Sequence, residues 1–186
     1  MQDTLLEIAK RFNQKDIFWA VGGSLMLQHY HLLNNPKDID IIVSIDDIDK
    51  ANDILVSLAK RKVQTNKKEY ATQYFYEYET PLVNIDLMAG FAIIHSQGQY
   101  VYPFDEHSIT TFSCEAINIH YYSLEDWYIL YQLMPNREEK VVLICDYFKH
   151  HTIKAPLLLT RSLDQKLPQS VQENVLYLLQ LEPHKL

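Results

Sequence analysis

The sequence predicts an α/β (α+β) fold, in which helices flank a mixed β-sheet and a small helical part follows at the C-terminal end. Three patterns lead to this prediction. Helical and strand-like segments alternate up to residue 59, runs rich in β-branched and aromatic residues fill 72–122, and helical periodicity returns from Ser123 onward. With 186 residues, of which 47% are hydrophobic, the chain is long enough to bury a core of its own.

The first half is expected to alternate between helices and strands. Apolar spacing predicts a helix over 5–12, a strand over 17–21, a helix over 24–33, a strand over 38–43 and a helix over 48–59. Ser24 is suited to cap the second of these helices, and Pro36 prevents its continuation.

The second half is expected to be rich in strands and then helical. Its β-branched and aromatic runs predict strands over 72–79, 82–88, 91–95, 99–104 and 116–122. A helix is predicted from Ser123 and another over 168–181, whereas propensity alone leaves the run 140–145 open between strand and helix. We place an α/β core at 1–122 and a helical C-terminal part, packed on that core, at 123–186.

Charge and cysteine content exclude several classes of function. The chain has 17 Lys and Arg against 24 Asp and Glu, a net charge of −7, which argues against nucleic acid or an anionic membrane as a partner. Cys114 and Cys145 fit neither a disulfide framework nor a zinc pattern, and they suit a reducing, cytoplasmic location. Because the chain starts without a basic stretch and an apolar run, and has no 18 consecutive apolar residues, we expect a soluble, unexported protein. The sequence also lacks a Walker-type loop, a Gly-x-Ser-x-Gly elbow and a His-Glu-x-x-His motif.

Two of the four glycines, Gly22 and Gly23, are adjacent between a predicted strand and a predicted helix that begins at Ser24. Glycines allow a tight turn there and let the backbone approach a ligand, while the free N–H groups of the next helix favour an anion. A phosphate would fit this turn. By itself, the pattern is also that of an ordinary strand-to-helix turn, and it indicates a phosphate site only together with other residues.

Acidic residues on two predicted strands complete the pattern. Because side chains on a strand alternate between its faces, Asp38 and Asp40 share one face of their strand. Asp86 interrupts a second, apolar strand, where a carboxylate is costly to bury unless it is paired or bound to a metal. Three such carboxylates suit Mg²⁺ or Mn²⁺. The alternative for the Asp-x-Asp pair is an edge strand with two solvated acids.

This order of strand, Gly-Gly-Ser turn, helix, Asp-x-Asp strand and later strand with a third Asp resembles the polymerase-beta-like nucleotidyltransferase superfamily. It is most similar to the small, stand-alone members related to antibiotic nucleotidyltransferases, over residues 16–89 and, loosely, 123–149. The resemblance implies that the turn (Gly22, Gly23, Ser24) binds the triphosphate of a nucleotide. It also implies that Asp38 and Asp40 ligate Mg²⁺, and that Asp86 completes the site and acts as, or orients, the base.

The chain departs from the family pattern at the positions of several basic residues. Many relatives have Arg and Thr before the paired acids, where this chain has Asn34 and Pro36 and keeps only Lys37 as a basic residue. Relatives also often carry a Lys where this chain has Gln132. The stretch 135–140 resembles the basic start of a further helix, which favours a helix over 137–149 and makes Arg137 and Lys140 candidate substitutes in phosphate binding. The alternative is that both are surface charges.

The distribution of charge bears on the acceptor. Residues 69–136 contain no Lys or Arg, nine acids and 15 of the 22 aromatic residues. An acidic, Tyr-rich surface would suit a small cationic, sugar-like or amine-bearing acceptor, although these tyrosines also suit a core. The one cluster that could hold nucleic acid, or could instead cover a helix end, is Lys60, Arg61, Lys62, Lys67 and Lys68.

The sequence therefore predicts a Mg²⁺-dependent nucleotidyltransferase that uses a nucleoside triphosphate (NTP) and releases pyrophosphate. The competing hypothesis is a nucleotide-sensing or partner-binding module, such as an antitoxin-like subunit, which the departures at Asn34, Pro36 and Gln132 favour. Nucleotide addition to RNA ends is a third hypothesis, against which the acidic charge argues.

Overall fold

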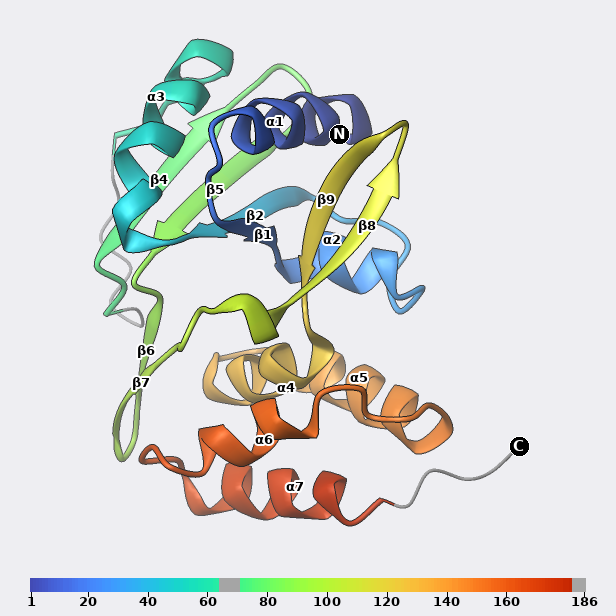
Figure 1. Cartoon of the computed structure of the whole chain (residues 1–186). Helices are drawn as coiled ribbons and strands as arrows, with labels where there is room; N and C mark the ends of the chain where they lie inside the picture. Colours follow the sequence, from blue (N-terminus) through green and yellow to red (C-terminus); the bar gives the residue numbers. More distant parts are fainter. Residues whose placement is uncertain (64–70, 182–186) are drawn as a thin grey trace.

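The structure, a computed structural model, describes residues 1–63 and 71–181 of the chain. Their elements form a mixed sheet with helices on both faces and four helices at the C-terminal end (Figure 1). In chain order the elements are α1 (Gln2–Gln14), β1 (Trp19–Val21), α2 (Gly23–His29), β2 (Asp38–Val43), η1 (Ile45–Asp47), α3 (Ile48–Leu58), β3 (Lys60–Arg61), β4 (Tyr74–Glu79), β5 (Asn84–Ala89), β6 (Ala92–His95), β7 (Gly98–Val101), η2 (Glu106–Ser108), β8 (Ile109–Cys114), β9 (Ile117–Tyr122), α4 (Leu124–Leu133), α5 (Glu138–His150), α6 (Pro156–Ser162) and α7 (Gln169–Leu179).

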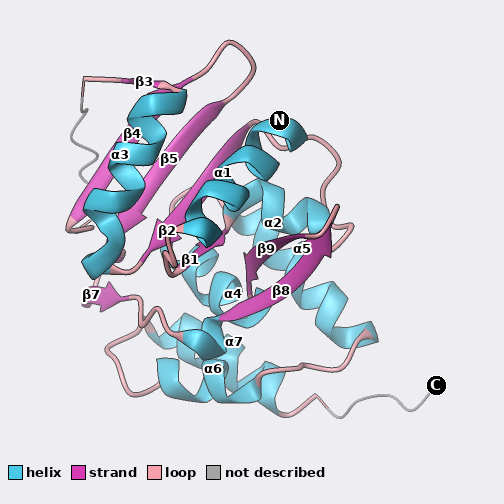
Figure 2. Ribbon diagram, turned by 45° about the horizontal axis from the view of Figure 1, so that its top comes forward, coloured by secondary structure: helices cyan, strands magenta, loops and turns pink. Residues whose placement is uncertain are grey.

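The main sheet of the described residues has seven strands in the order β3-β4-β5-β2-β1-β9-β8, and β6 pairs with β7 in a separate hairpin. Strand β2 is parallel to β5 and antiparallel to β1, and β1 is parallel to β9. Helices α1 and α3 lie on one face of this sheet, and α2 lies behind it (Figure 2). The predicted mixed sheet flanked by helices, with helices following at the C-terminal end, is confirmed.

One part of the core lies on the sheet face that α1 and α3 cover, and another includes residues of α2 and of the C-terminal helices. Alternation along β2 buries Ile39 and Ile41 completely and leaves Asp38 and Asp40, which point to the other face, partly exposed. The apolar stripe of α1 is buried over Leu5, Ile8, Ala9 and Phe12. The burial of β2 therefore fixes which face of the sheet carries its two acids.

Several predicted elements need correction. Helix α2 ends at His29 and not at residue 33, because His31 adopts a positive φ of 60° that a right-handed helix cannot continue through. The residue that caps α2 is Gly22, so the prediction that Ser24 caps it is wrong. The run 140–145, left open by propensity, belongs to helix α5.

Strand β8 and helix α6 were not predicted. Strand β8 lies at the edge of the sheet with its central residues exposed, so it lacks the apolar alternation that marks a half-buried strand. Helix α6 has only seven residues, with Pro156 at its first position. Lys60 and Arg61, two members of the basic cluster, follow α3 directly and pair with β4 as the short edge strand β3.

Helix α4 joins the C-terminal helices to one another. It packs against α5, α6 and α7 and also contacts β6. The division of the chain at residue 122 stays a prediction. Every helix of the described residues is too short or too polar to cross a lipid bilayer.

A buried ion pair fixes α6 to the start of α4. The Arg161 guanidinium donates to Asp105 at 2.8 Å and to Asp126 at 2.9 Å, and the Tyr102 hydroxyl donates to Asp126 at 2.9 Å. The Asp126 side chain is completely buried. Burial raises the pKa of Asp126 to about 6, although Arg161 and the hydrogen bonds act in the opposite direction.

Candidate active site

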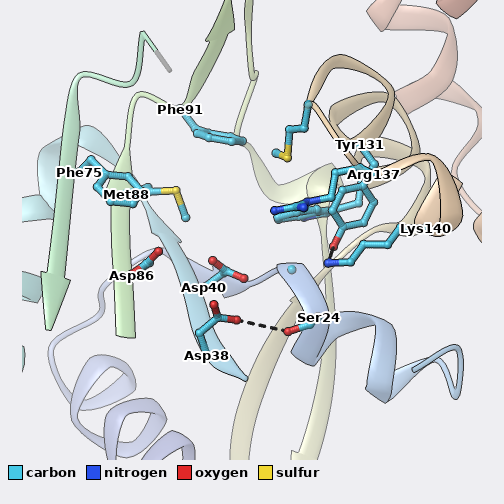
Figure 3. A pocket seen from close by; sticks show the side chains of 13 residues that line it. Ser24, Asp38, Asp40, Phe75, Asp86, Met88, Phe91, Tyr131, Arg137 and Lys140 are labelled. Carbon is cyan, nitrogen blue, oxygen red and sulfur yellow. Dashed lines mark hydrogen bonds between the residues drawn. The ribbon is translucent and has the colours of Figure 1, made fainter. Parts of the chain in front are cut away.

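A pocket of about 170 Å³ lies between the sheet and helices α4 and α5 (Figure 3). One wall comes from the turn after β1 and from strands β2, β4 and β5, and the other comes from α4 and the start of α5. The residues that line it are Gly23, Ser24, Asp38, Asp40, Phe75, Asp86, Met88, Phe91, Trp127, Tyr131, Met134, Arg137 and Lys140. The pocket therefore joins residues from widely separated parts of the chain.

The register between β2 and β5 brings the three predicted acids together. The parallel pairing places Asp40 opposite Asp86 and Asp38 opposite Asn84. Residues opposite one another in neighbouring strands point to the same face, so Asp38, Asp40 and Asp86 all line the pocket (Figure 3).

The Gly-Gly turn presses directly against the acids. Gly23 has a φ of +60°, and a Cβ added there would collide with the Oδ2 atom of Asp40. The Gly22 N–H donates to the Asp40 carbonyl at 2.9 Å, and the Ser24 hydroxyl donates to Asp38 Oδ1 at 3.3 Å. Both the left-handed conformation and the lack of a side chain are required at Gly23.

Replacing Gly23 by Ala should lower the free energy of unfolding by about 2 kcal/mol or more, because the methyl group forces a strained backbone and displaces Asp40. Urea denaturation measures this loss. Gly98→Ala is a control for a positive φ without a collision, since Gly98 (φ 141°) has no described atom within 4 Å of an added Cβ. A loss below about 1 kcal/mol in Gly23→Ala, no more than the strain of a positive φ alone, would show that the contact with Asp40 contributes nothing.

Two cations lie on the opposite wall from the acids (Figure 3). Arg137 caps the start of α5, and Lys140 lies in its first turn. The Lys140 ammonium donates to the Tyr131 hydroxyl at 3.5 Å and lies 4.8 Å from the centroid of that ring. Burial and the nearby Arg137 lower the pKa of Lys140, while Asp40 and Asp38 act in the opposite direction. The pocket thus offers carboxylates on one side and cations on the other.

Other predicted site residues do not line this pocket. Lys37 is exposed in the loop before β2, and Gly22 is not among the lining residues but touches one of them, because an added Cβ would collide with the Trp127 ring. The side chain of Gln132 donates to the Tyr128 carbonyl at 3.1 Å and accepts from Asn174 at 2.7 Å. Gln132 therefore connects helices and does not stand in for the basic residue of the relatives.

The basic cluster has partners on the sheet. Lys60 forms an ion pair with Glu79 at 3.7 Å, Arg61 stacks over the Tyr76 ring at 3.8 Å, and Lys62 donates to Asn84 at 3.0 Å. Lys67 and Lys68 lie outside the described residues.

Sequence reasoning missed the aromatic and apolar part of the pocket. Trp127, Tyr131 and Met134 are spaced along one face of α4 and its end, which on sequence alone is also the pattern of a core helix. Phe75 and Met88 are opposite one another in β4 and β5. No local signal separates these residues from ordinary core residues, and only the pocket does.

The donor set suits a hard divalent cation. Carboxylate oxygens are the ligands that Mg²⁺ and Mn²⁺ prefer, and the described lining of the pocket contains neither Cys nor His, the thiolate and imidazole ligands of softer metals. Within residues 1–63 and 71–181, no three His, Cys, Asp or Glu side chains are arranged as a ready-made metal site. Asp38, Asp40 and Asp86 nevertheless fit such an ion, because their oxygens are suitable ligands and because they lie on the same face of the sheet.

No family model matches the sequence, and no curated protein is significantly similar to it. Solved structures do match the fold. The inferred nucleotidyltransferase TM1012 of Thermotoga maritima is 20% identical with a TM-score of 0.62, covering 76% of this chain and 89% of that one. ANT(2″)-Ia, solved with adenylyl-2″-tobramycin, is 14% identical with a TM-score of 0.56, covering 88% and 97%. The lincomycin-bound lincosamide antibiotic adenylyltransferase LnuA is 14% identical with a TM-score of 0.54, covering 77% and 96%. The chain has the fold of small nucleotidyltransferases.

Proposed function

We propose that the protein is a Mg²⁺- or Mn²⁺-dependent nucleotidyltransferase. It would move a nucleoside monophosphate from an NTP to a hydroxyl of a small acceptor and release pyrophosphate. The observation that carries this proposal is one pocket in which Asp38, Asp40 and Asp86 lie beside the Gly23 turn and across from two cations. The shared fold with ANT(2″)-Ia and LnuA supports it.

Each polar residue has a role in this proposal. Asp38, Asp40 and Asp86 would hold the divalent ion, which would neutralise phosphate charge and activate the attacking hydroxyl. Arg137 and Lys140 would bind the triphosphate.

The reaction forms a bond between the acceptor oxygen and the α-phosphorus and breaks the bond from that phosphorus to the leaving pyrophosphate. Asp86 would accept, or orient the group that accepts, the proton of the acceptor hydroxyl. Ser24 donates its one hydroxyl proton to Asp38 in this structure, and would turn it to a phosphate oxygen once a nucleotide is bound.

A small acceptor fits the composition of the sheet wall. Phe75, Met88 and Phe91 give that wall an apolar surface next to the three carboxylates. Such a wall suits a compact molecule with an amine or sugar group, because the aromatic rings cover its carbon skeleton and their faces attract an ammonium group. Many of the tyrosines of residues 69–136 are instead buried in the core, among them Tyr78, Tyr100, Tyr102 and Tyr122.

The proposal is tested by pyrophosphate release from ATP, GTP, CTP and UTP with Mg²⁺ and a panel of amino-sugar and lincosamide acceptors. Release that depends on both an NTP and an acceptor supports it. If a nucleotide binds but no acceptor gives release, the chain is a nucleotide-binding or partner-binding module. The replacement of the relatives' basic residue by Gln132, whose side chain bonds to Tyr128 of its own helix and to Asn174 of α7, favours that second candidate.

Replacing Lys140 by Gln should lower kcat/KM for the nucleotide roughly 10- to 100-fold, because a charge-assisted contact to phosphate is lost. The same release assay at varied nucleotide concentration measures it. Lys149→Gln is the matched control, since Lys149 lies on the same helix and pairs with Asp146 on the outside of the molecule. Equal effects of the two variants would contradict the role given to Lys140.

A further inference from the structure

The indole of Trp127 is a buried hydrogen-bond donor without a partner among the described residues. Trp127 is 3% exposed, lines the pocket, and its Nε1 atom has no acceptor. Ring contacts with Tyr131 at 4.9 Å and Tyr122 at 6.1 Å between centroids hold the indole in place. The N–H therefore stays buried and unsatisfied in the ligand-free chain.

The position of this N–H distinguishes it from other unsatisfied atoms. The other buried atoms without a partner, which belong to His95, Tyr100, Tyr122 and Arg161, do not line this pocket. The Nε1 atom lies beside the Gly-Gly turn, 2.9 Å from the place where a Cβ of Gly22 would be. Buried donors are normally satisfied, so an unsatisfied one on a pocket wall indicates an acceptor that arrives with a ligand.

The second tryptophan of the chain shows the ordinary case. The Nε1 atom of Trp19, which is completely buried in the core, donates to Asn13 at 3.0 Å. Among the described residues, the buried indole outside the pocket thus has an acceptor, and the indole that lines the pocket has none.

We propose that the Trp127 N–H donates to a phosphate oxygen of the NTP and is a positioning contact for the triphosphate. This inference rests on the proposed function. An oxyanion is the acceptor that fits, because the indole shares its wall with the cations Arg137 and Lys140 and adjoins a turn without side chains. A nucleoside base is the other possible source of an acceptor, and the probes below separate the two.

The two indole N–H signals of the ¹⁵N-labelled protein report on this contact directly. With Mg²⁺ present, α,β-methylene-ATP and inorganic tripolyphosphate should both shift the Trp127 signal, whereas adenosine should not. The Trp19 signal is the internal control and should stay in place. A Trp127 signal that moves with adenosine, or stays in place while α,β-methylene-ATP binds, overturns the inference.

Replacing Trp127 by Phe keeps an aromatic ring and removes the donor. Affinity for α,β-methylene-ATP, measured by calorimetry, should fall roughly 5- to 30-fold. Both Trp127→Phe and Trp19→Phe should lower the midpoint of urea unfolding without nucleotide, because each removes part of a buried ring, and Trp19→Phe also leaves Asn13 without its donor. Trp19→Phe should leave the affinity unchanged. A lower midpoint with unchanged affinity in Trp127→Phe would make Trp127 a purely structural residue.

The proposed function and this inference fail in different ways. Nucleotide binding that depends on Lys140 without any response of Trp127 removes the inference and leaves the function standing. A wild-type chain that binds no nucleotide removes both.

Discussion

Replacing Asp40 by Asn is expected to reduce pyrophosphate release by a factor of about 1000. Asp40 lies between the Gly23 turn and Asp86, so it is the carboxylate best placed to share an ion with both neighbouring acids. A loss of about 4 kcal/mol of charge stabilisation corresponds to three powers of ten in rate. The measurement is the initial rate of release with saturating NTP and the best acceptor.

Two further results decide whether this loss is catalytic. Asparagine has nearly the same shape as aspartate and relieves repulsion among the three carboxylates, so the free energy of unfolding of Asp40→Asn should not fall. Asp49→Asn, on the exposed side of α3, should keep full activity. An Asp40→Asn variant that is folded and retains more than about a tenth of the activity would contradict the catalytic proposal.

Replacing Arg161 by Met should lower the free energy of unfolding by about 3 kcal/mol at pH 7.5, because it leaves the buried Asp126 carboxyl without its cation. The loss should be smaller at pH 5. Burial holds the folded-state pKa of Asp126 at about 6, above the ordinary 3.8, so this group stabilises the fold most below the lower value and loses its contribution as pH rises. In the variant, Arg161 no longer lowers the pKa of Asp126, so this pKa rises further. The decrease in the free energy of unfolding with rising pH therefore continues to a higher pH than in the wild type.

Urea denaturation at the two pH values measures this effect. The double variant Asp126→Asn with Arg161→Met should be more stable at pH 7.5 than Arg161→Met alone, because it no longer buries a carboxylate without a cation. The same loss at both pH values, without recovery in the double variant, would mean that Arg161 acts only through packing.

Local patterns in the sequence predicted much of the fold and part of the site. The alternation in β2 was sufficient to place Asp38 and Asp40 on one face, because the apolar residues between them had to be buried. The sequence of neither strand alone predicts that β2 pairs with β5. That register, which places Asp40 opposite Asp86, depends on the arrangement of the whole sheet.

The residues that sequence reasoning missed share a physical reason. Trp127 and Tyr131 are large, apolar and at helical spacing, so they look the same whether a helix faces a core or a ligand. The conformation of Gly23 was predicted only as an allowance for a turn, whereas the structure shows contact between the turn and Asp40. The roles of all these residues remain predictions until they are measured.

The origin of the two pocket walls has a consequence for how such a protein can change. Of the charged residues that line the pocket in the described part of the chain, all three carboxylates precede Phe91, and both cations follow Met134. A chain cut after Tyr122 would keep every negative charge of the pocket and none of its positive charge. Replacing the last four helices by another set could therefore change which molecules bind, while Asp38, Asp40 and Asp86 are retained.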